Sequence, residues 1–522
     1  MKKNILRIGI FALFICFTNS VCFGQLTAEQ VDALVKSAMA KFKVAGVSVG
    51  IVKDGKIVYA KGFGVKSVET KSPVDEHTNF GIASNSKAFA TLALAMLVEE
   101  GKLKWTDKVK DHIPEFKMYD SYVTENFIIE DLLTHRSGLG LGAGDLMFFP
   151  DGTDFKMKDL LPVFQHFKPT SQFRTKFDYD NLLYFVAGEV VKRISGMTWE
   201  DFVTKRILSP LKMDKSVTQI DKLKDKSNLA TPHSSDGGKL RSLADNKEMI
   251  NGAAGGIYSN ADDMCQWLLA NLNKGKYGEG LKDTLFTANT QKKLWKIHTV
   301  LDADPDPRYN SHFAGYGLGW NLTDKKGNLV VQHTGGLPGM ASKVVMIPDL
   351  NFGIVVLTNT TLEGAGVYST VINTVVDSYL GLNDNAWLDK FVTFFENRAK
   401  SGDTVTDQVW ADVRKADKSK VVENDYIGVY EDVWFGKMEV FKKGDDLWMK
   451  SYRSPKLNGQ MFFYKANTFA IKWEFQDMNC DAFAMFSLDE NGKANGLKMK
   501  GISPNIDFSF DFQDLELKRV KK

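Results

Sequence analysis

Apolar and polar positions repeat along the chain with two different periods, and the order of those periods predicts how the strands and helices are arranged. Residues 26–42 have helical spacing, and residues 46–65 are typical of two strands that turn at Asp54 and Gly55. Helical spacing dominates from 80 to about 270. Strand patterns return at 316–322, 342–349 and 352–360, before a helical pattern at 366–382. Strands at both ends of this region with helices between them predict one sheet assembled from distant parts of the chain.

The last part of the chain has a different pattern. Residues 383–420 are charged with helical spacing and are typical of a helical linker. From 421 to 522, short segments alternate between apolar and polar positions and are separated by turns such as 442–446 and 489–493. This pattern predicts a small antiparallel sandwich or barrel. We therefore expect a leader at 1–24, a main domain at 25–382, a helical linker at 383–420 and a β-barrel domain at 421–522.

The leader resembles a signal peptide. A positively charged start, 1–7, precedes ten apolar residues and a cleavage position after Gly24. The apolar run is short for a membrane span, which needs about 20 residues. An uncleaved anchor or a lipid-modified Cys22 is the alternative, although Phe23 does not favour lipidation. The prediction is a periplasmic or secreted bacterial protein with no stable membrane span after cleavage.

Composition and charge exclude several classes of function. Hydrophobic residues make up 43% of the chain and charged residues 25%, as in ordinary soluble proteins. A net charge of +3 with no basic block argues against a nucleic-acid partner. The cysteines outside the leader, Cys265 and Cys480, form neither a disulfide framework nor a metal cluster, and the histidines lack metal-binding spacing. We expect no metal and no organic cofactor; the sequence leaves the oligomeric state open.

The pair Ser84 and Lys87 is the first candidate for chemistry. The two residues lie one helical turn apart, at the start of a strongly apolar helical segment. A partly desolvated lysine there could take the proton of the serine, and the helix start favours an anionic nucleophile. The alternative is a polar first turn with a solvated lysine. The same S-x-x-K spacing recurs at Ser209 and Lys212, where Pro210 argues for a loop without chemistry.

Two further segments contribute polar groups. Phe177-Asp-Tyr179-Asp-Asn181 supplies a phenol and an amide just before a helical pattern. Gln332-His333-Thr334-Gly335-Gly336 precedes a strand, and glycines beside a strand allow another backbone to come close. Each segment alone is typical of a turn.

Together, Ser84-Asn-Ser-Lys87, Tyr179-Asp-Asn181 and His333-Thr-Gly335 resemble the three motifs of the penicillin-recognising serine hydrolases, in order and in approximate spacing. The resemblance is to the branch with class C β-lactamases, D-Ala-D-Ala carboxypeptidases, D-aminopeptidases and related esterases, and covers about residues 30–382. The C-terminal part resembles the lipocalin-like barrel of some of these hydrolases. The resemblance implies an α+β catalytic domain, with an antiparallel sheet flanked by helices and a mainly helical lobe, followed by this small antiparallel barrel.

The resemblance implies a role for each residue. Ser84 would attack a carbonyl and become acylated, while Lys87 and Tyr179 would share the proton transfers, with the principal base left open. Asn181 would hold Lys87 and bind the substrate amide. The main-chain N–H groups of Ser84 and Gly336 would form the oxyanion hole.

The third motif implies the binding edge. Gly335 would keep a strand edge bare for an extended substrate, beside Thr334 and Gly336. His333 stands where class C enzymes generally have lysine. A neutral imidazole can donate a hydrogen bond to a substrate, but it attracts a carboxylate less than an ammonium does. His135 and Arg136 are expected to brace a loop near the site.

The function expected on these grounds is an exported serine hydrolase that forms an acyl-enzyme on peptide or amide bonds, with D-amino-acid peptides as the first choice. An esterase or a weak β-lactamase is the alternative within the family. A penicillin-binding sensor that is acylated without turnover, and a noncatalytic scaffold whose barrel binds a partner, are the alternatives from other classes.

Overall fold

The computed structural model describes residues 25–235, 239–247 and 249–521. An eight-stranded antiparallel sheet has the strand order β2-β1-β14-β13-β12-β11-β10-β9. Strand β1 pairs with β14, so that Val47 lies opposite Thr358. This confirms the expected sheet from distant parts of the chain. The strands are β1 (Gly46–Lys53), β2 (Lys56–Gly64), β9 (Thr299–Leu301), β10 (Ala314–Tyr316), β11 (Asn321–Lys325), β12 (Asn328–Leu337), β13 (Met340–Ile347) and β14 (Phe352–Thr358).

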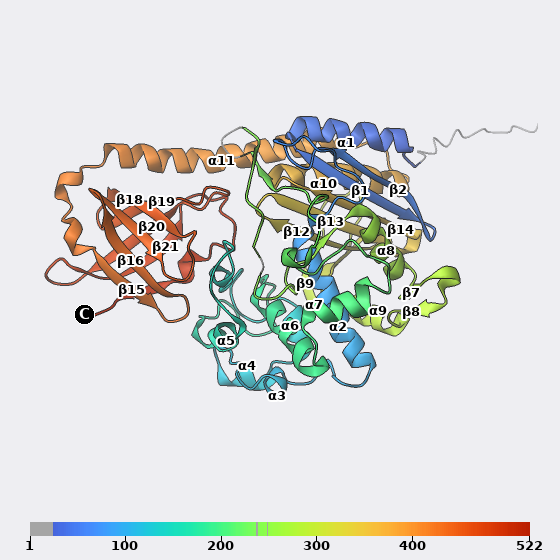
Figure 1. The fold of residues 1–522 in the computed structure, drawn as a ribbon, viewed down its shortest axis with the longest axis horizontal. Coiled ribbons are helices and arrows are strands. Elements are labelled where there is room, and N and C mark those ends of the chain that lie inside the picture. The colour runs from blue at the N-terminus through green and yellow to red at the C-terminus, as the bar shows by residue number, and fades with distance from the viewer. Residues whose placement is uncertain (1–24, 236–238, 248, 522) are drawn as a thin grey trace, which may run out of the picture.

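Helices cover both faces of this sheet (Figure 1). On one face, α1 (Ala28–Phe42) and α10 (Leu362–Tyr379) bury valines and isoleucines against β1 and β14. On the other face, α8 (Ala261–Leu272) and α2 (Ser86–Glu99) belong to a second apolar cluster. Helix α1 begins at the capping box of Thr27, the signal that fixes a helix start.

One expected strand is wrong. The pattern at 316–322 predicts a continuous strand, but β10 ends at Tyr316 and β11 begins at Asn321. The intervening residues form a turn in which Gly317 N–H donates to the Trp320 carbonyl at 2.8 Å. Gly319 has a φ of 78°, which favours glycine. A Cβ on Gly317 would lie 2.5 Å from the Leu294 carbonyl oxygen, so the turn also needs a bare backbone there.

The helical lobe is built around α2 and α6 (Leu182–Ser195). Every residue of α2 from 86 to 97 is buried, which is the property of a helix surrounded by protein on all sides. Shorter helices close the lobe: α3 (Val109–His112), α4 (Ser121–Asn126), α5 (Met157–Leu160), α7 (Trp199–Val203) and α9 (Ala288–Leu294).

A long helix, α11 (Trp387–Lys415), leads from the sheet to a closed eight-stranded barrel (Figure 1). Tyr430 opposite Arg519 closes the barrel between its first and last strands. The strands are β15 (Gly428–Asp432), β16 (Gly436–Lys443), β17 (Asp446–Ser451), β18 (Asn458–Lys465), β19 (Thr468–Trp473), β20 (Ala482–Leu488), β21 (Ala494–Gly501) and β22 (Glu516–Arg519).

The barrel packs against the helical lobe and not only against its linker. Phe149 of the lobe and Phe510 of the barrel have ring centroids 5.0 Å apart, and both belong to one continuous apolar cluster. Arg453 of the barrel pairs with Asp154 at 2.7 Å and with Asp159 at 3.0 Å. In the described part of the chain, none of the helices has the length and apolar character needed to cross a bilayer.

Candidate active site

Ser84 lies in a strained turn, η1 (Ala83–Asn85), between β3 (Phe80–Gly81) and α2. Ala83 has a φ of 50°, which non-glycine residues rarely adopt and which costs about 1–3 kcal/mol. Ser342 on β13 holds the turn: its hydroxyl donates to the Ile82 carbonyl at 2.7 Å and accepts from Asn85 at 2.8 Å. Backbone strain of this kind is typical of functional sites. The turn places Ser84 at the wall of a cavity, while its neighbours Ala83 and Asn85 are buried.

Lys87, in the first turn of α2, is fully buried. Its Nζ lies 3.0 Å from Ser84 Oγ, 2.7 Å from Asn181 Oδ1 and 2.9 Å from the Ala254 carbonyl oxygen. Burial lowers the pKa of Lys87 from 10.5 to about 7. A substantial fraction of the amine is therefore neutral near pH 7, and a neutral amine can accept the proton of Ser84.

Asn181 is fixed from both ends of its amide. Asn181 directly precedes α6 in the chain; its Oδ1 accepts from Lys87, and its Nδ2 donates to Asp145 Oδ2 at 2.8 Å. Burial raises the pKa of Asp145 well above its usual range and that of Asp180 to about 7. Both carboxyl groups oppose the lowering of the Lys87 pKa, so the ionisation of the lysine depends on this cluster.

Tyr179 places its ring centroid 4.8 Å from Lys87 Nζ. Burial raises the pKa of its phenol well above 10, and a hydrogen bond with the Ser84 hydroxyl opposes this rise. The phenol is therefore neutral at physiological pH, which suits a proton donor better than a base. His135 packs behind it with ring centroids 4.1 Å apart and accepts from the Asp180 N–H at 3.0 Å, as expected of a bracing residue.

His333 has a different environment from the one expected. It is 2% exposed, and its Nδ1 lies 2.7 Å from the Thr334 carbonyl oxygen. A carbonyl only accepts, so Nδ1 carries the proton and Nε2 accepts from the Tyr316 hydroxyl at 3.0 Å. Burial lowers the pKa of His333 to about 3, which keeps the imidazole neutral. Both ring nitrogens bind within the protein, so His333 braces its strand rather than offering a free donor to a substrate.

The two glycines of the third motif have different surroundings. A Cβ on Gly335 would lie 2.1 Å from the Ile82 carbonyl oxygen, so this glycine lets the turn before Ser84 approach β12. The expected role of Gly335 in keeping the edge bare is therefore replaced by close packing. A Cβ on Gly336 would meet no atom within 4 Å. Strand β12 pairs with β11 only as far as Gln332, and beyond it no described strand pairs with that side of residues 333–337.

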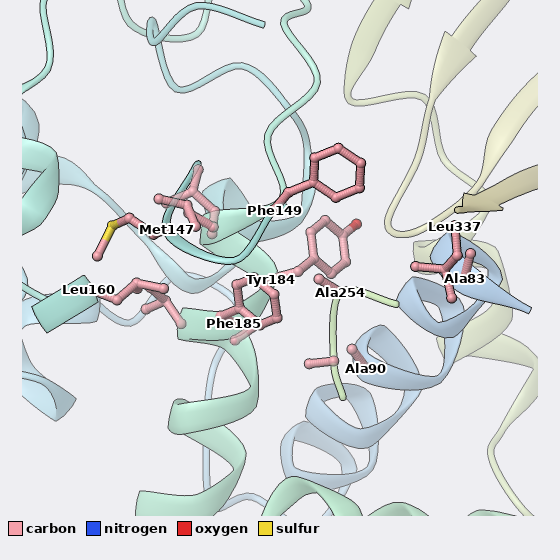
Figure 2. Close-up of a cluster of buried hydrophobic side chains, with 14 of the residues drawn as sticks. Ala83, Ala90, Met147, Phe149, Leu160, Tyr184, Phe185, Ala254 and Leu337 are labelled. Atoms are coloured by element: carbon pink, nitrogen blue, oxygen red, sulfur yellow. The ribbon is translucent and has the colours of Figure 1, made fainter. Parts of the chain in front are cut away.

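A cavity of 390 Å³ unites these segments. It is lined by seven of the eight predicted site residues, and the eighth, Lys87, lies buried beneath Ser84. Figure 2 shows part of the buried apolar cluster, with Ala90 of α2, Tyr184 and Phe185 of α6, and Ala254. The lining residues are Ala83, Ser84, Phe148, Phe149, Phe177, Tyr179, Asn181, Met249, Ala254, Gly255, Asn321, His333, Thr334, Gly335, Gly336, Leu337, Pro338, Thr361, Met478, Asp507, Phe508 and Ser509.

The sequence does not indicate several residues that line or support this cavity. Asp145 behind Asn181 and Tyr316 behind His333 belong to no motif of the chain. The last four lining residues come from the barrel. The glycine-rich stretch before Asp145 is the one local signal that could have drawn attention to it.

The charge of the cavity is distinctive. Among the described residues that line it, none is lysine or arginine, and Asp507 is the one carboxylate. Within the same described ranges, no group of three or more His, Cys, Asp or Glu residues could hold a metal ion. The site thus presents an alcohol, an amine, a phenol and an amide, without a cation at its surface.

Comparison with known proteins gives the same family. Residues 31–370 match the family model described as Beta-lactamase, and residues 414–519 match a domain of unknown function, DUF3471. The unguisins hydrolase ungD' of Aspergillus campestris is 26% identical over 66% of this chain. Protein flp of Staphylococcus aureus is 27% identical over 64% of it. In both cases the match spans 64% of the relative's own length.

Two solved structures share the fold. The octameric penicillin-binding protein homologue of Pyrococcus abyssi covers 94% of this chain and all of its own, with a TM-score of 0.58 and 21% identity. The penicillin-binding protein of Bacillus halodurans covers 66% of this chain and 98% of its own, with a TM-score of 0.54 and 25% identity. With the match over residues 31–370, these findings establish that the chain belongs to the β-lactamase family of serine hydrolases and carries a C-terminal β-barrel.

Proposed function

We propose that this protein is an exported serine hydrolase that forms an acyl-enzyme at Ser84 and cleaves amide or peptide bonds, D-amino-acid peptides being the first choice of substrate. The observation that carries the proposal is the buried Lys87 amine, 3.0 Å from Ser84 Oγ, with a pKa lowered to about 7. A serine beside a neutral amine is the pairing that acyl transfer requires. The proposed export signal, 1–24, lies outside the described residues.

Acylation follows from these positions. Neutral Lys87 takes the proton of Ser84 as its Oγ attacks the substrate carbonyl carbon. The N–H groups of Ser84 and Gly336 would receive the developing oxyanion, each such donor contributing about 3 kcal/mol. The neutral phenol of Tyr179 then gives a proton to the leaving nitrogen and regains one from Lys87, so the amide C–N bond breaks without a free amide anion.

Deacylation reverses the proton path. A water gives a proton to Lys87, directly or through Tyr179, and its oxygen bonds to the acyl carbon. The ester bond breaks, and Ser84 Oγ recovers a proton from Lys87. Lys87 is favoured as the principal base because the pKa of Tyr179 is raised well above 10 while that of Lys87 is lowered.

The substrate class is inferred from the edge and the charge of the cavity. The unpaired side of β12 at 333–337 can receive an extended chain by strand addition. Without a lysine or arginine among the described lining residues, the cavity holds no clamp for a substrate carboxylate. This favours peptide amides and neutral esters over penicillin-like acids, and it supports an amidase or aminopeptidase more than an efficient β-lactamase.

Turnover of a substrate panel tests the proposal. D-aminoacyl amides, D-Ala-D-Ala peptides, nitrocefin and nitrophenyl esters are compared with wild-type protein and Ser84→Ala. We expect the highest kcat/KM on an amide or peptide, and no turnover by the variant. A single stoichiometric burst on every substrate would instead identify a penicillin-binding sensor. Turnover that survives in Ser84→Ala would refute the assignment.

A further inference from the structure

The barrel sends one segment into the helical lobe. Residues 502–515, between β21 and β22, pass beside the loop that holds Asp145. The Asp511 carboxylate accepts the N–H groups of Gly144 at 2.7 Å and Leu146 at 2.9 Å. Asp511 is fully buried. This contact therefore fixes the backbone on both sides of Asp145 from a residue more than 360 positions away.

Ser509 connects this segment to the catalytic groups. Its Oγ donates to Asp145 Oδ2 at 2.8 Å, and the same oxygen accepts from Asn181 Nδ2 at 2.8 Å. Asn181 Oδ1 in turn accepts from Lys87 Nζ at 2.7 Å, and Lys87 lies 3.0 Å from Ser84 Oγ. Ser509 is 6% exposed and Asp145 is fully buried, so water does not easily replace this hydroxyl.

Phe508 forms part of the cavity wall next to Tyr179. The two rings are nearly perpendicular, with centroids 5.9 Å apart. On the other side, a Cβ on Gly142 would lie 2.7 Å from Phe508 Cδ2, so the lobe packs directly against this residue. Phe508 nevertheless remains 38% exposed. An aromatic side chain held in place but open to the cavity can limit the size of a bound group.

Domain packing alone does not require these side chains. The ion pairs of Arg453 with Asp154 and Asp159, and that of Lys456 with Asp151 at 2.5 Å, already attach the barrel to the lobe away from the cavity lining. The apolar contact of Phe149 with Phe510 adds to them. Phe508 and Ser509 instead face the cavity that contains Ser84.

We infer that the barrel segment 507–509 is part of the active site: Ser509 is a positioning residue that holds Asn181 through Asp145, and Phe508 determines the size of the substrate group that fits beside Tyr179. The inference rests on the proposed function and extends it to the second domain. Removal of the Ser509 hydroxyl leaves Asp145 with one hydrogen bond fewer and loosens the amide that orients Lys87.

The pH dependence of acylation reports on this chain of contacts. A less well hydrogen-bonded Asp145 favours its neutral form, which removes a carboxylate that stabilises charged Lys87. Lys87 then becomes neutral at lower pH. The titratable groups that face Lys87 or Asp145 from the surrounding elements are Tyr179, Asp180, Tyr184, His135, His333 and Asp511.

The first experiment compares Ser509→Ala and Ser509→Thr with Ser487→Ala, which removes an exposed hydroxyl of the barrel. The rate of phosphonylation of Ser84 by a fluorophosphonate, in which an Oγ–P bond forms and fluoride leaves, and steady-state kcat and KM are measured from pH 5 to 9. We expect Ser509→Ala to lower kcat about 2- to 10-fold, the range of one hydrogen bond, with KM unchanged and the acidic limb moved to lower pH. Ser509→Thr should restore the wild-type limb. If Ser509→Ala has the same kcat and the same acidic limb of the pH–rate profile as Ser487→Ala, the positioning role is overturned.

The second experiment uses nitrophenyl esters with acetyl, phenylacetyl and naphthylacetyl groups. Phe508→Ala, at a partly exposed position that tolerates truncation, should raise the kcat/KM ratio of the largest to the smallest ester about tenfold. Phe508→Trp should lower it. The control, Phe394→Ala, removes a 55% exposed ring on α11. An unchanged ratio in both Phe508 variants would overturn the role in substrate size.

The proposed function and the inference about the barrel segment would be contradicted by different results. If the wild-type protein neither turns over any ester nor reacts with the fluorophosphonate at Ser84, the proposed function fails. If the wild-type protein is active and the variants at 508 and 509 behave as their controls, only the inference about the barrel fails. Thermal unfolding of each variant separates a local effect from loss of the fold.

Discussion

The chain contains the S-x-x-K spacing twice, and the two copies have opposite surroundings. At the first copy, Lys87 is fully buried and hydrogen-bonded to Ser84 and Asn181. At the second, Ser209 and Lys212 are exposed, and Lys212 has a φ of 56° in a turn that follows Pro210. The same residue types at the same spacing thus yield a desolvated amine beside a serine in one place and a solvated turn in the other.

The S-x-x-K spacing alone therefore does not make a reactive pair; the lysine must also be buried. A lysine in water has a pKa of about 10 and is therefore protonated at neutral pH. In that form it cannot accept the proton of a serine hydroxyl. Desolvation alone does not create a reactive pair: burial lowers the pKa of Lys343 on β13 to about 8, but its Nζ lies over the Tyr368 ring, 5.8 Å from the ring centroid. A reactive pair requires both desolvation and a nucleophile within hydrogen-bonding distance.

The largest expected effect comes from the two serines. Ser84→Ala should abolish turnover, because it removes the serine hydroxyl that lies 3.0 Å from Lys87 Nζ. Ser209→Ala should leave kcat/KM at the wild-type value, since that hydroxyl is exposed on a turn. Steady-state kinetics on the best substrate of the panel measures both. Equal losses in the two variants would remove the basis of the comparison.

The two lysines should differ almost as much. Lys87→Met keeps the volume of the buried chain but removes the base, and we expect kcat to fall by about 10²–10⁴. Lys212→Met changes an exposed side chain and should have no effect on kcat. The rate of acylation by a fluorescent penicillin, or of phosphonylation by a fluorophosphonate, measures the difference. Wild-type acylation in Lys87→Met would show that another group accepts the proton.

Asn181 binds Lys87, the lysine of the first S-x-x-K copy, so its replacement tests how much that contact contributes. Asn181→Ala removes the acceptor 2.7 Å from Lys87 Nζ and should lower kcat/KM about 10- to 100-fold, the range of one hydrogen bond to a charged group. Asn321→Ala, on the cavity wall at the start of β11, is the matched asparagine control. A smaller loss in Asn181→Ala than in Asn321→Ala would contradict the role of Asn181.

The pH dependence gives the smallest effect but the most specific one. Since burial lowers the pKa of Lys87 to about 7, the neutral base is lost as pH falls through that value. Acylation should therefore decrease about tenfold per unit below pH 7 and level off above it. Pre-steady-state labelling from pH 5 to 10 measures this profile. A profile that rises only near pH 10 would contradict a desolvated base.

Much of this site could be predicted from the sequence because three of its segments are short and contiguous. Ser84 and Lys87 lie one turn apart, Asn181 follows Tyr179 closely, and His333 begins the third motif. Apolar periodicity indicated one sheet assembled from distant parts of the chain and a β-structured C-terminal domain, while the fold class followed from the three motifs together. The strand at 316–322 was wrong because Gly317 and Gly319 interrupt an otherwise apolar run.

The rest depends on contacts that leave no local pattern. Ser509 and Asp145 are 364 positions apart, and each stands in a segment that is typical of a loop. The role of His333 was also hidden, because its tautomer depends on Tyr316 across the sheet and on the Thr334 carbonyl. The sequence pattern marks Gly335 as an edge glycine, whereas a Cβ at this position would lie 2.1 Å from the Ile82 carbonyl oxygen of another segment.

The central claim is that Ser84 alone is the reactive nucleophile, and mass spectrometry shows which serine carries the covalent phosphonyl adduct. The full chain is treated with a fluorophosphonate, digested and mapped, with Ser84→Ala and Ser209→Ala treated in parallel. The account predicts one adduct per chain, on the peptide that contains Ser84, in the wild type and in Ser209→Ala, and none in Ser84→Ala. An adduct on any other serine, or wild-type protein that stays unlabelled, would contradict it.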